Sequence, residues 1–179
     1  MKSSPVIRTA DANDAAEVSR LLRSAMLTYC ADSGISSSML EAMTESVESV
    51  SDRITRQTCL VAVSNGKIVG TICIKKVENP LIYSFSDKTF RFLKDAGLSF
   101  YISRFAIKQS LRKSGVGIDL MTRALDIAKE AGAGCVLLHS AATNRNMVEF
   151  YGKRGFELID SEDSRGYIRG LFANSLLYN

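Results

Sequence analysis

The feature that most constrains the fold of this 179-residue chain is the junction at residues 101–117, where an apolar run enters a basic, glycine-bearing loop. Aromatic and β-branched residues predominate at residues 100–107, which predicts a strand. Apolar residues recur every three to four positions over residues 117–131, which predicts a helix. The loop between them contains Gly115 and Gly117, and residues without a Cβ let successive N–H groups turn toward one anion.

The start of the predicted helix favours the same ligand. The first turn of a helix has unpaired N–H donors and the positive end of the helix dipole, and Arg112 and Lys113 add formal charge beside it. The junction therefore predicts a phosphate-binding loop, although two glycines near a helix start also fit a simple tight turn.

Two common nucleotide-binding motifs do not match this loop. A dinucleotide fingerprint needs a third glycine, where the chain has Leu120, and it normally follows the first strand of a sheet. A P-loop needs an early glycine and a Gly-Lys-Ser/Thr triplet, which the adjacent Lys113 and Ser114 do not complete. The remaining pattern is Arg112-x-x-Gly115-x-Gly117.

Composition indicates one globular domain over residues 1–179, with 46% hydrophobic and 23% charged residues. The four cysteines are too widely spaced to form a metal-ligand pair and predict buried, reduced thiols: Cys30, Cys59, Cys73 and Cys135. Residues 1–11 have no apolar stretch of the signal-peptide kind, and no run approaches the length of a membrane span. These features predict a cytoplasmic protein without a membrane partner.

The charge pattern favours one anionic ligand over a nucleic-acid surface. The net charge is only +4, and basic residues cluster only around residues 108–113. We therefore expect no nucleic-acid partner. A nucleic-acid-binding domain is kept only as a third hypothesis, behind the two functions given at the end of this section.

The other elements follow from local patterns. A type I′ hairpin is predicted at Asn65-Gly66 between β-branched runs. Strands are expected at residues 5–9, 59–63, 67–77, 98–107, 134–140, 156–160 and 166–172. Helices are expected at residues 15–29, 39–56, 117–131 and from Thr143 or Asn144 to Lys153. Residues 78–97 are read as a connection with a possible strand or loop at 81–85 and one or two helical turns at 87–95.

Two motifs resemble those of the GCN5-related N-acetyltransferase (GNAT) superfamily. The pattern Arg112-x-x-Gly115-x-Gly117 resembles the acyl-CoA loop of that family, Q/R-x-x-G-x-G/A. Residues 144–156 resemble its second signature, with Asn144 seven residues before Tyr151 and a Gly-Phe pair shortly after. The order of predicted elements also matches over nearly the whole chain.

The resemblance implies an α+β fold. Its central mixed, mostly antiparallel sheet would have about seven strands flanked by about four helices. A splayed parallel pair of strands, at residues 98–107 and 134–140, would form the cofactor site.

The resemblance also implies the ligands and their residues. Acetyl-CoA would be the cosubstrate, with no metal. The expected cofactor-binding residues are Phe105, Ala106, Ile107, Arg112, Lys113, Ser114, Gly115, Val116, Gly117 and Asn144. Asn144 would either hydrogen-bond the pantetheine or cap its own helix. Tyr151 would be the catalytic residue that protonates the departing thiolate, the alternative being a core aromatic residue.

The chain departs from the family pattern at the strand that feeds the loop. Several family members have a glutamate there, whereas the corresponding residues here are Tyr101, Ser103 and Arg104. The candidate bases that remain lie in the region that is hardest to predict: Glu78, Asp87 and Asp95. Arg104 is expected either to pair with a carboxylate or to point into the acceptor groove. His139 is expected to be a core or edge residue, with a place at the acceptor site as the alternative.

The leading functional hypothesis is direct acetyl transfer from acetyl-CoA to a small amine, an amino acid or a peptide amino group. The alternative is an acyl-CoA-binding regulatory module without amine acetylation, because the strand carboxylate is missing. A homodimer is compatible with either hypothesis.

Overall fold

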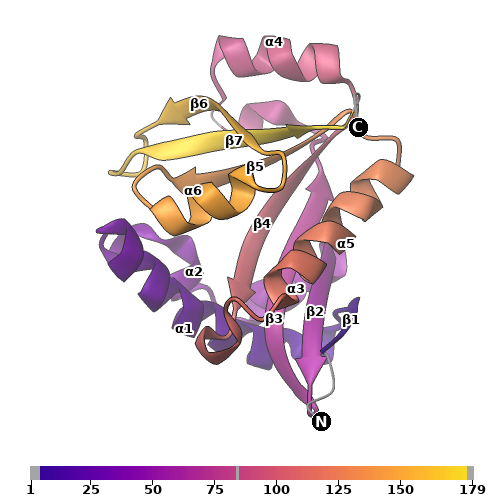
Figure 1. Cartoon of the computed structure of the whole chain (residues 1–179), viewed down its shortest axis with the longest axis vertical. Helices are drawn as coiled ribbons and strands as arrows, with labels where there is room; N and C mark the ends of the chain where they lie inside the picture. Colours follow the sequence, from indigo (N-terminus) through magenta and orange to yellow (C-terminus); the bar gives the residue numbers. More distant parts are fainter. Residues whose placement is uncertain (1–4, 84, 177–179) are drawn as a thin grey trace.

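The computed structural model describes residues 5–83 and 85–176, which form one seven-stranded sheet in the order β1-β2-β3-β4-β5-β7-β6 (Figure 1). The strands are β1 (Val6–Thr9), β2 (Thr58–Ser64), β3 (Lys67–Lys76), β4 (Ser99–Ile107), β5 (Cys135–Ala141), β6 (Glu157–Glu162) and β7 (Arg169–Ser175). All neighbours are antiparallel except β4 and β5, which are parallel. The predicted mixed, mostly antiparallel sheet is confirmed.

The described residues form six α-helices, where about four were expected. They are α1 (Ala15–Ser33), α2 (Glu41–Thr44), α3 (Val47–Arg56), α4 (Asp87–Ala96), α5 (Val116–Glu130) and α6 (Arg145–Gly152). The single helix predicted at residues 39–56 is wrong, because Glu45 is extended and Ser46 caps α3 by accepting a hydrogen bond from the Ser49 N–H. Residues 87–96 form a full helix capped by Ser86, and Pro80–Tyr83 is a 3₁₀ turn.

The hairpin between β2 and β3 forms at the predicted turn. Asn65 and Gly66 both have positive φ, 51° and 70°, as a type I′ turn requires. The register pairs Ser64 with Lys67. Cys59 lies opposite Cys73 in the same ladder, and all four cysteines are buried free thiols, as predicted.

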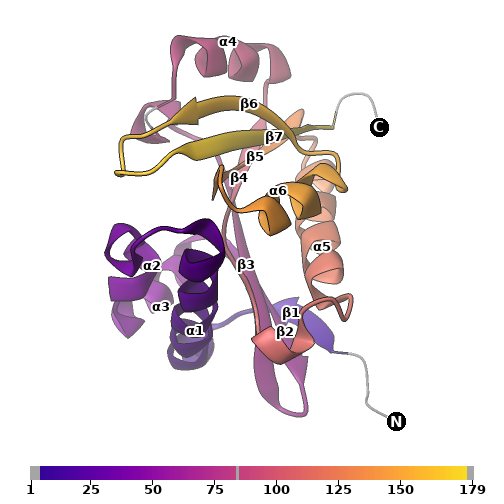
Figure 2. The same ribbon diagram turned by 60° about the vertical axis from the view of Figure 1, so that its left-hand side comes forward.

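Helices cover both faces of the sheet (Figure 2). On one face, α1 and α3 pack on β2 and β3 through residues such as Leu22 and Val50, and α4 packs on β5 and β7 through Leu93. On the other face, α5 and α6 bury Leu120 and Tyr151 against the sheet. Because strand side chains alternate, Leu138 of β5 faces α5 and α6.

The parallel pair is splayed. Within the described chain, β4 and β5 pair only from Ser99 with Cys135 to Ile102 with Leu138. Beyond that point β4 stays with β3 and β5 stays with β7. A bulge in β4 lies just beyond this point, where three steps along β4 oppose two along β3, and Arg104 within it has a φ of 53°. The described helices include none long and apolar enough to cross a membrane.

Candidate active site

A cavity of about 830 Å³ lies where β4 and β5 separate. Its lining includes both faces of the sheet: the loop before α5 and helix α6 on one side, and α1, α2 and the turn between β6 and β7 on the other. The gap between the two strands thus connects a pocket beside the glycine loop with a second pocket beside α1 and α2. We call these the loop end and the acceptor end of the cavity.

The glycine loop presents free backbone donors at the loop end. Lys113 and Gly115 have φ values of 63° and 99°, and Gly115 is the N-cap of α5. The N–H groups of Lys113, Gly115, Val116, Gly117 and Ile118 have no acceptor in the part of the chain that the structure describes. This cluster at a helix N-terminus has the donor set that a pyrophosphate needs.

Two residues of the predicted loop site use their N–H groups within the loop. Arg112 donates to the Gln109 carbonyl at 3.2 Å and Ser114 to the Leu111 carbonyl at 3.3 Å. Their backbone groups therefore fold the loop, while the Arg112 side chain lines the cavity and supplies positive charge.

The open edge of β4 offers further backbone groups. Successive strand residues direct their N–H and C=O groups to opposite sides, and Lys108 donates to the Val69 carbonyl of β3 at 2.8 Å. Ala106 therefore faces β3 with its backbone, whereas Phe105 and Ile107 direct theirs into the gap. An extended ligand can pair with these two residues as an added strand would.

Tyr151 is both a core residue and a cavity residue. Its ring is 6% exposed and contacts Phe150, Phe156 and Phe172. It also lines the cavity, and its hydroxyl has no hydrogen-bond partner among the described residues. Burial raises the pKa of Tyr151 well above its usual range, so the phenol stays protonated and can donate a proton.

Asn144 caps its own helix. Its side-chain oxygen accepts the Met147 N–H at 3.1 Å, and its amide donates to the Ser33 hydroxyl at 2.9 Å. The side chain is 1% exposed. The geometry supports the cap alternative, and the bond to Ser33 fixes α6 against the end of α1.

His139 lies at the acceptor end beside Tyr101. The Tyr101 hydroxyl is 2.7 Å from His139 Nδ1, and His139 lines the cavity. Burial, with a smaller effect of Arg169, lowers the pKa of His139 to about 4, and burial raises the pKa of Tyr101 to about 12. Both groups are therefore neutral at pH 7, and in the tautomer with the proton on Nδ1 the Nε2 atom of His139 is a hydrogen-bond acceptor.

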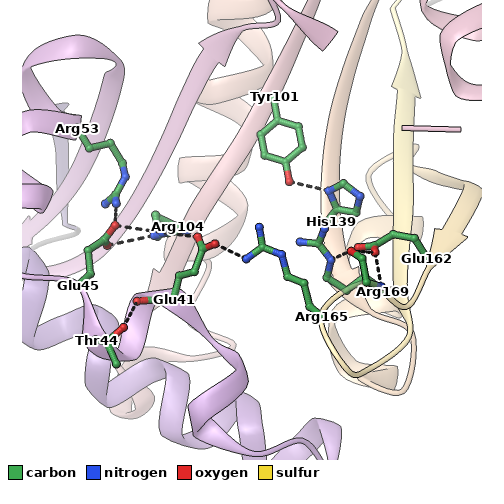
Figure 3. Close-up of polar contacts among 11 residues, drawn as sticks. Glu41, Thr44, Glu45, Arg53, Tyr101, Arg104, His139, Glu162, Arg165 and Arg169 are labelled. Carbon is green, nitrogen blue, oxygen red and sulfur yellow. Dashed lines mark hydrogen bonds and ion pairs between the residues drawn. The ribbon is translucent and has the colours of Figure 1, made fainter. Parts of the chain in front are cut away.

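Both positions predicted for Arg104 are observed, because it pairs with a carboxylate and also lines the cavity. Its Nε and Nη2 donate to Glu45 at 3.2 and 3.1 Å, and Nη2 lies 3.7 Å from Glu41 (Figure 3). Arg53 forms an ion pair with the same Glu45 from α3. The Arg104 side chain also lines the cavity.

The predicted candidate bases do not line the cavity. Glu78, Asp87 and Asp95 are absent from the lining described above, and Asp87 begins α4 at another end of the sheet. Of the two carboxylates that pair with Arg104, Glu41 lines the cavity, and it lies in the segment that was predicted as one continuous helix. Asp32 of α1 and Glu149 of α6 also line it. Two arginines of the cavity lining were not predicted: Arg165 lies in a polar turn and Arg169 just after it. Their only local signal is a pair of arginines four residues apart.

Comparison with known proteins identifies the family. Residues 20–156, most of the chain, match the family model described as the acetyltransferase (GNAT) family. The chain belongs to the GNAT family. The family resemblance inferred from residues 112–117 and 144–156 is therefore confirmed, together with the acetyltransferase class. Acetyl-CoA is the acyl donor that this class uses.

One curated relative of this GNAT chain is the N-alpha-acetyltransferase MAK3 of Arabidopsis thaliana, which is 30% identical over 100 residues. The match covers 56% of this chain and 45% of the Arabidopsis protein, so it spans less than half of that relative.

Solved structures share the fold over the whole chain. The PaiA N-acetyltransferase of Thermoplasma acidophilum, in complex with coenzyme A, has a TM-score of 0.73 at 20% identity and covers 97% of this chain and 99% of its own. Ard1 of Thermoplasma volcanium has a TM-score of 0.71 at 20% identity, with 98% and 99% covered. At these identities the comparison establishes the fold.

Gly117→Asp is expected to weaken CoA binding by roughly tenfold or more, which corresponds to about 1.4 kcal/mol. The substitution places a negative charge in the cluster of N–H donors, and its Cβ meets the Phe105 ring at 3.3 Å. Titration calorimetry with CoA measures the change. Gly152→Asp is the matched control, because a Cβ there has open space and Gly152 does not line the cavity. Equal affinities of the two variants would contradict the assignment of the loop.

His139 is expected to make stability depend on pH between about 4 and about 6.5. In this interval the unfolded state binds a proton that the folded state excludes, so the free energy of unfolding falls as the pH falls. Urea denaturation at pH 7.5 and pH 5 should show a smaller loss for His139→Gln than for the unmodified protein. Because this is the one histidine of the chain, equal losses would contradict the burial of a neutral imidazole.

Proposed function

We propose that this GNAT protein transfers an acetyl group from acetyl-CoA to an amine by direct attack. The observation that carries the proposal is the cavity through the gap between β4 and β5. It places unpaired loop N–H groups at one end, His139 with Tyr101 hydrogen-bonded behind it at the other, and Tyr151 in its lining.

The residues at the loop end fit an acyl-CoA. The free N–H groups of residues 113 and 115–118 would bind the pyrophosphate, with Arg112 and Lys113 adding charge. Backbone groups of Phe105 and Ile107 would pair with the pantetheine arm. Ala106 lines the cavity but pairs its backbone with β3, so it would contact the arm only by packing. Asn144 would act indirectly, by positioning α6. Acetyl-CoA, when bound, supplies an activated thioester.

Tyr151 would donate the proton that the departing thiolate needs. Its hydroxyl is free of intramolecular partners among the described residues, so no hydrogen bond has to break before donation. The surrounding Phe150, Phe156 and Phe172 rings hold the side chain and exclude water. This role is general-acid catalysis. The proton that the attacking nitrogen loses as the amide forms would pass to water in the cavity, and water would return a proton to the Tyr151 phenolate, so that the protons balance.

The Tyr101–His139 pair would hold the amine at the acceptor end. With Nδ1 held 2.7 Å from the Tyr101 hydroxyl, Nε2 of a neutral His139 can accept a hydrogen bond from an N–H of the amine and leave the amine lone pair free for attack. With a pKa of about 4, His139 is a weak base, so the pair orients a neutral amine more than it removes a proton from an ammonium. This assigns to Tyr101 and His139 the place of the missing strand carboxylate.

The acceptor would be a small amine, an amino acid or a peptide amino group. The name of the Arabidopsis relative, an N-alpha-acetyltransferase, supports an α-amino group. The cavity reaches between α1, α2 and the turn before β7, so an acceptor enters from the face opposite to the loop.

Thiol release from acetyl-CoA across a panel of amines tests the proposal. Tyr151→Phe should lower turnover by roughly 10²-fold while leaving CoA affinity nearly unchanged, because only a proton donor is removed. Tyr83→Phe is the control, since Tyr83 does not line the cavity and phenylalanine keeps the ring that packs on Phe85 and Tyr101. CoA binding without turnover on any amine would favour the regulatory module. Unchanged turnover in Tyr151→Phe would make Tyr151 a core residue only.

A further inference from the structure

Three arginines form the wall of the acceptor end. Arg104 comes from the bulge of β4, Arg165 from the turn between β6 and β7, and Arg169 from the start of β7 (Figure 3). They lie far apart in the sequence, and only the fold brings them to one cavity. Asp32 and Glu41 also line this end, so three guanidinium groups face two carboxylates, and the remaining positive charge is not explained by the binding of an amine.

The carboxylates that pair with these arginines mostly lie behind them. Glu45 binds both Arg104 and Arg53, and Glu162 binds Arg169, yet neither Glu45 nor Glu162 lines the cavity. Their side chains are 9% and 21% exposed. Glu41 is the carboxylate partner that does line the cavity, so the cavity-facing surface of this cluster consists of the guanidinium groups and Glu41.

Several guanidinium donors remain unused. Among the described residues, Arg169 donates a side-chain hydrogen bond only from Nε, to Glu162, and Arg165 only from Nη1, to Glu41. The Arg165 side chain is 39% exposed and the Arg169 side chain 13%, and both line the cavity. Two neighbouring guanidinium groups with free donors match a carboxylate, which accepts in a fork geometry.

Glu41 occupies one of these donors from across the cavity. Its ion pair with Arg165 joins α2 to the turn before β7, and the two side chains are 62% and 39% exposed. Exposed pairs of this kind contribute little free energy, so a carboxylate of a ligand can replace Glu41 on Arg165. The pair marks the position at which an anionic group of the acceptor would bind.

The arginines also lie near the proposed amine site. Burial is the largest cause of the lowered pKa of His139, and Arg169 and Arg165 both lower it further. Arg169, Arg165 and Arg104 likewise act on the pKa of Tyr101 in the direction opposite to burial. His139, Arg165 and Arg169 all line the cavity, and Arg169 of β7 pairs with Ala141 of β5, two residues after His139, so these groups share one site.

We propose that the acceptor is an amine that also carries a carboxylate, which Arg165 and Arg169 bind while the amine lies against His139. This inference rests on the proposed acetyl transfer and narrows its substrate class to amino acids or to peptides with an acidic first residue. Arg104, fixed by Glu45, holds the wall of the site.

Matched acceptor pairs test this inference. Free amino acids are compared with their carboxamides, which keep the shape and the amine but lose the negative charge. Peptide amides that begin with aspartate or glutamate are compared with those that begin with asparagine or glutamine. We expect kcat/KM to be at least about tenfold higher for the carboxylate member of one of the two series. The series that shows the preference identifies the source of the carboxylate.

Variants at Arg165 and Arg169 test whether the arginine cluster causes the preference for acceptors with a carboxylate. Arg165→Gln and Arg169→Gln should bring the carboxylate-to-carboxamide ratio of kcat/KM toward one, and Arg165→Lys should retain part of it. Arg123→Gln is the matched control, because Arg123 forms an exposed pair with Glu130 on α5, away from the cavity. CoA affinity serves as the folding check for each variant.

The two proposals fail in different ways. If no amine is acetylated although CoA binds, the proposed acetyl transfer is wrong. If amines are acetylated with equal kcat/KM for carboxylates and carboxamides, or if the ratio survives both glutamine substitutions, the arginine cluster does not select the acceptor. Preference for polyamines over amino acids would also overturn the inference.

Discussion

The separation of β4 from β5 leaves backbone hydrogen-bonding groups of a central strand without a protein partner. In the middle of a sheet such groups are normally paired, because an unpaired buried N–H or C=O costs free energy. Here Phe105 and Ile107 direct theirs into a gap that opens after Ile102. A bulge with Arg104 in the left-handed region maintains this geometry, and the same bulge directs that side chain toward Glu45. The bulge of β4 thus lies where β4 leaves β5, and it also places Arg104 in the wall of the acceptor end.

The gap also explains why residues from opposite faces of the sheet contribute to one site. Leu138 and Tyr151 belong to the core beneath α5 and α6, whereas Tyr101 packs with the cluster beneath α4. Elsewhere in the sheet these two layers are separated by paired strands. At the gap a ligand can extend from the glycine loop on one face to the arginines on the other. The direct transfer that we propose needs this passage, because donor and acceptor must meet without a covalent enzyme intermediate.

The cofactor half of the site was predictable because its signals are local in sequence. Gly115, Gly117 and the spacing from Asn144 to Tyr151 lie within short segments, and backbone conformation at the loop follows from them. The acceptor half depends on tertiary contacts between distant segments. Arg104 meets Glu45 across 59 positions, and Tyr101 meets His139 across 38. The break between α2 and α3 was not predicted, because apolar residues recur at helical spacing through this segment. Glu45, which lies at the break, binds two arginines instead of continuing the helix.

The central claim is that the gap and the glycine loop together bind an acyl-CoA. Amide hydrogen exchange with and without CoA tests it at the level of single residues. Exchange should slow at Phe105 and Ile107 and at the N–H groups of residues 113 and 115–118, which have no acceptor in the described structure. Exchange along the exposed edge strand β1 should stay the same. CoA binding that leaves residues 105–118 unprotected would contradict the account.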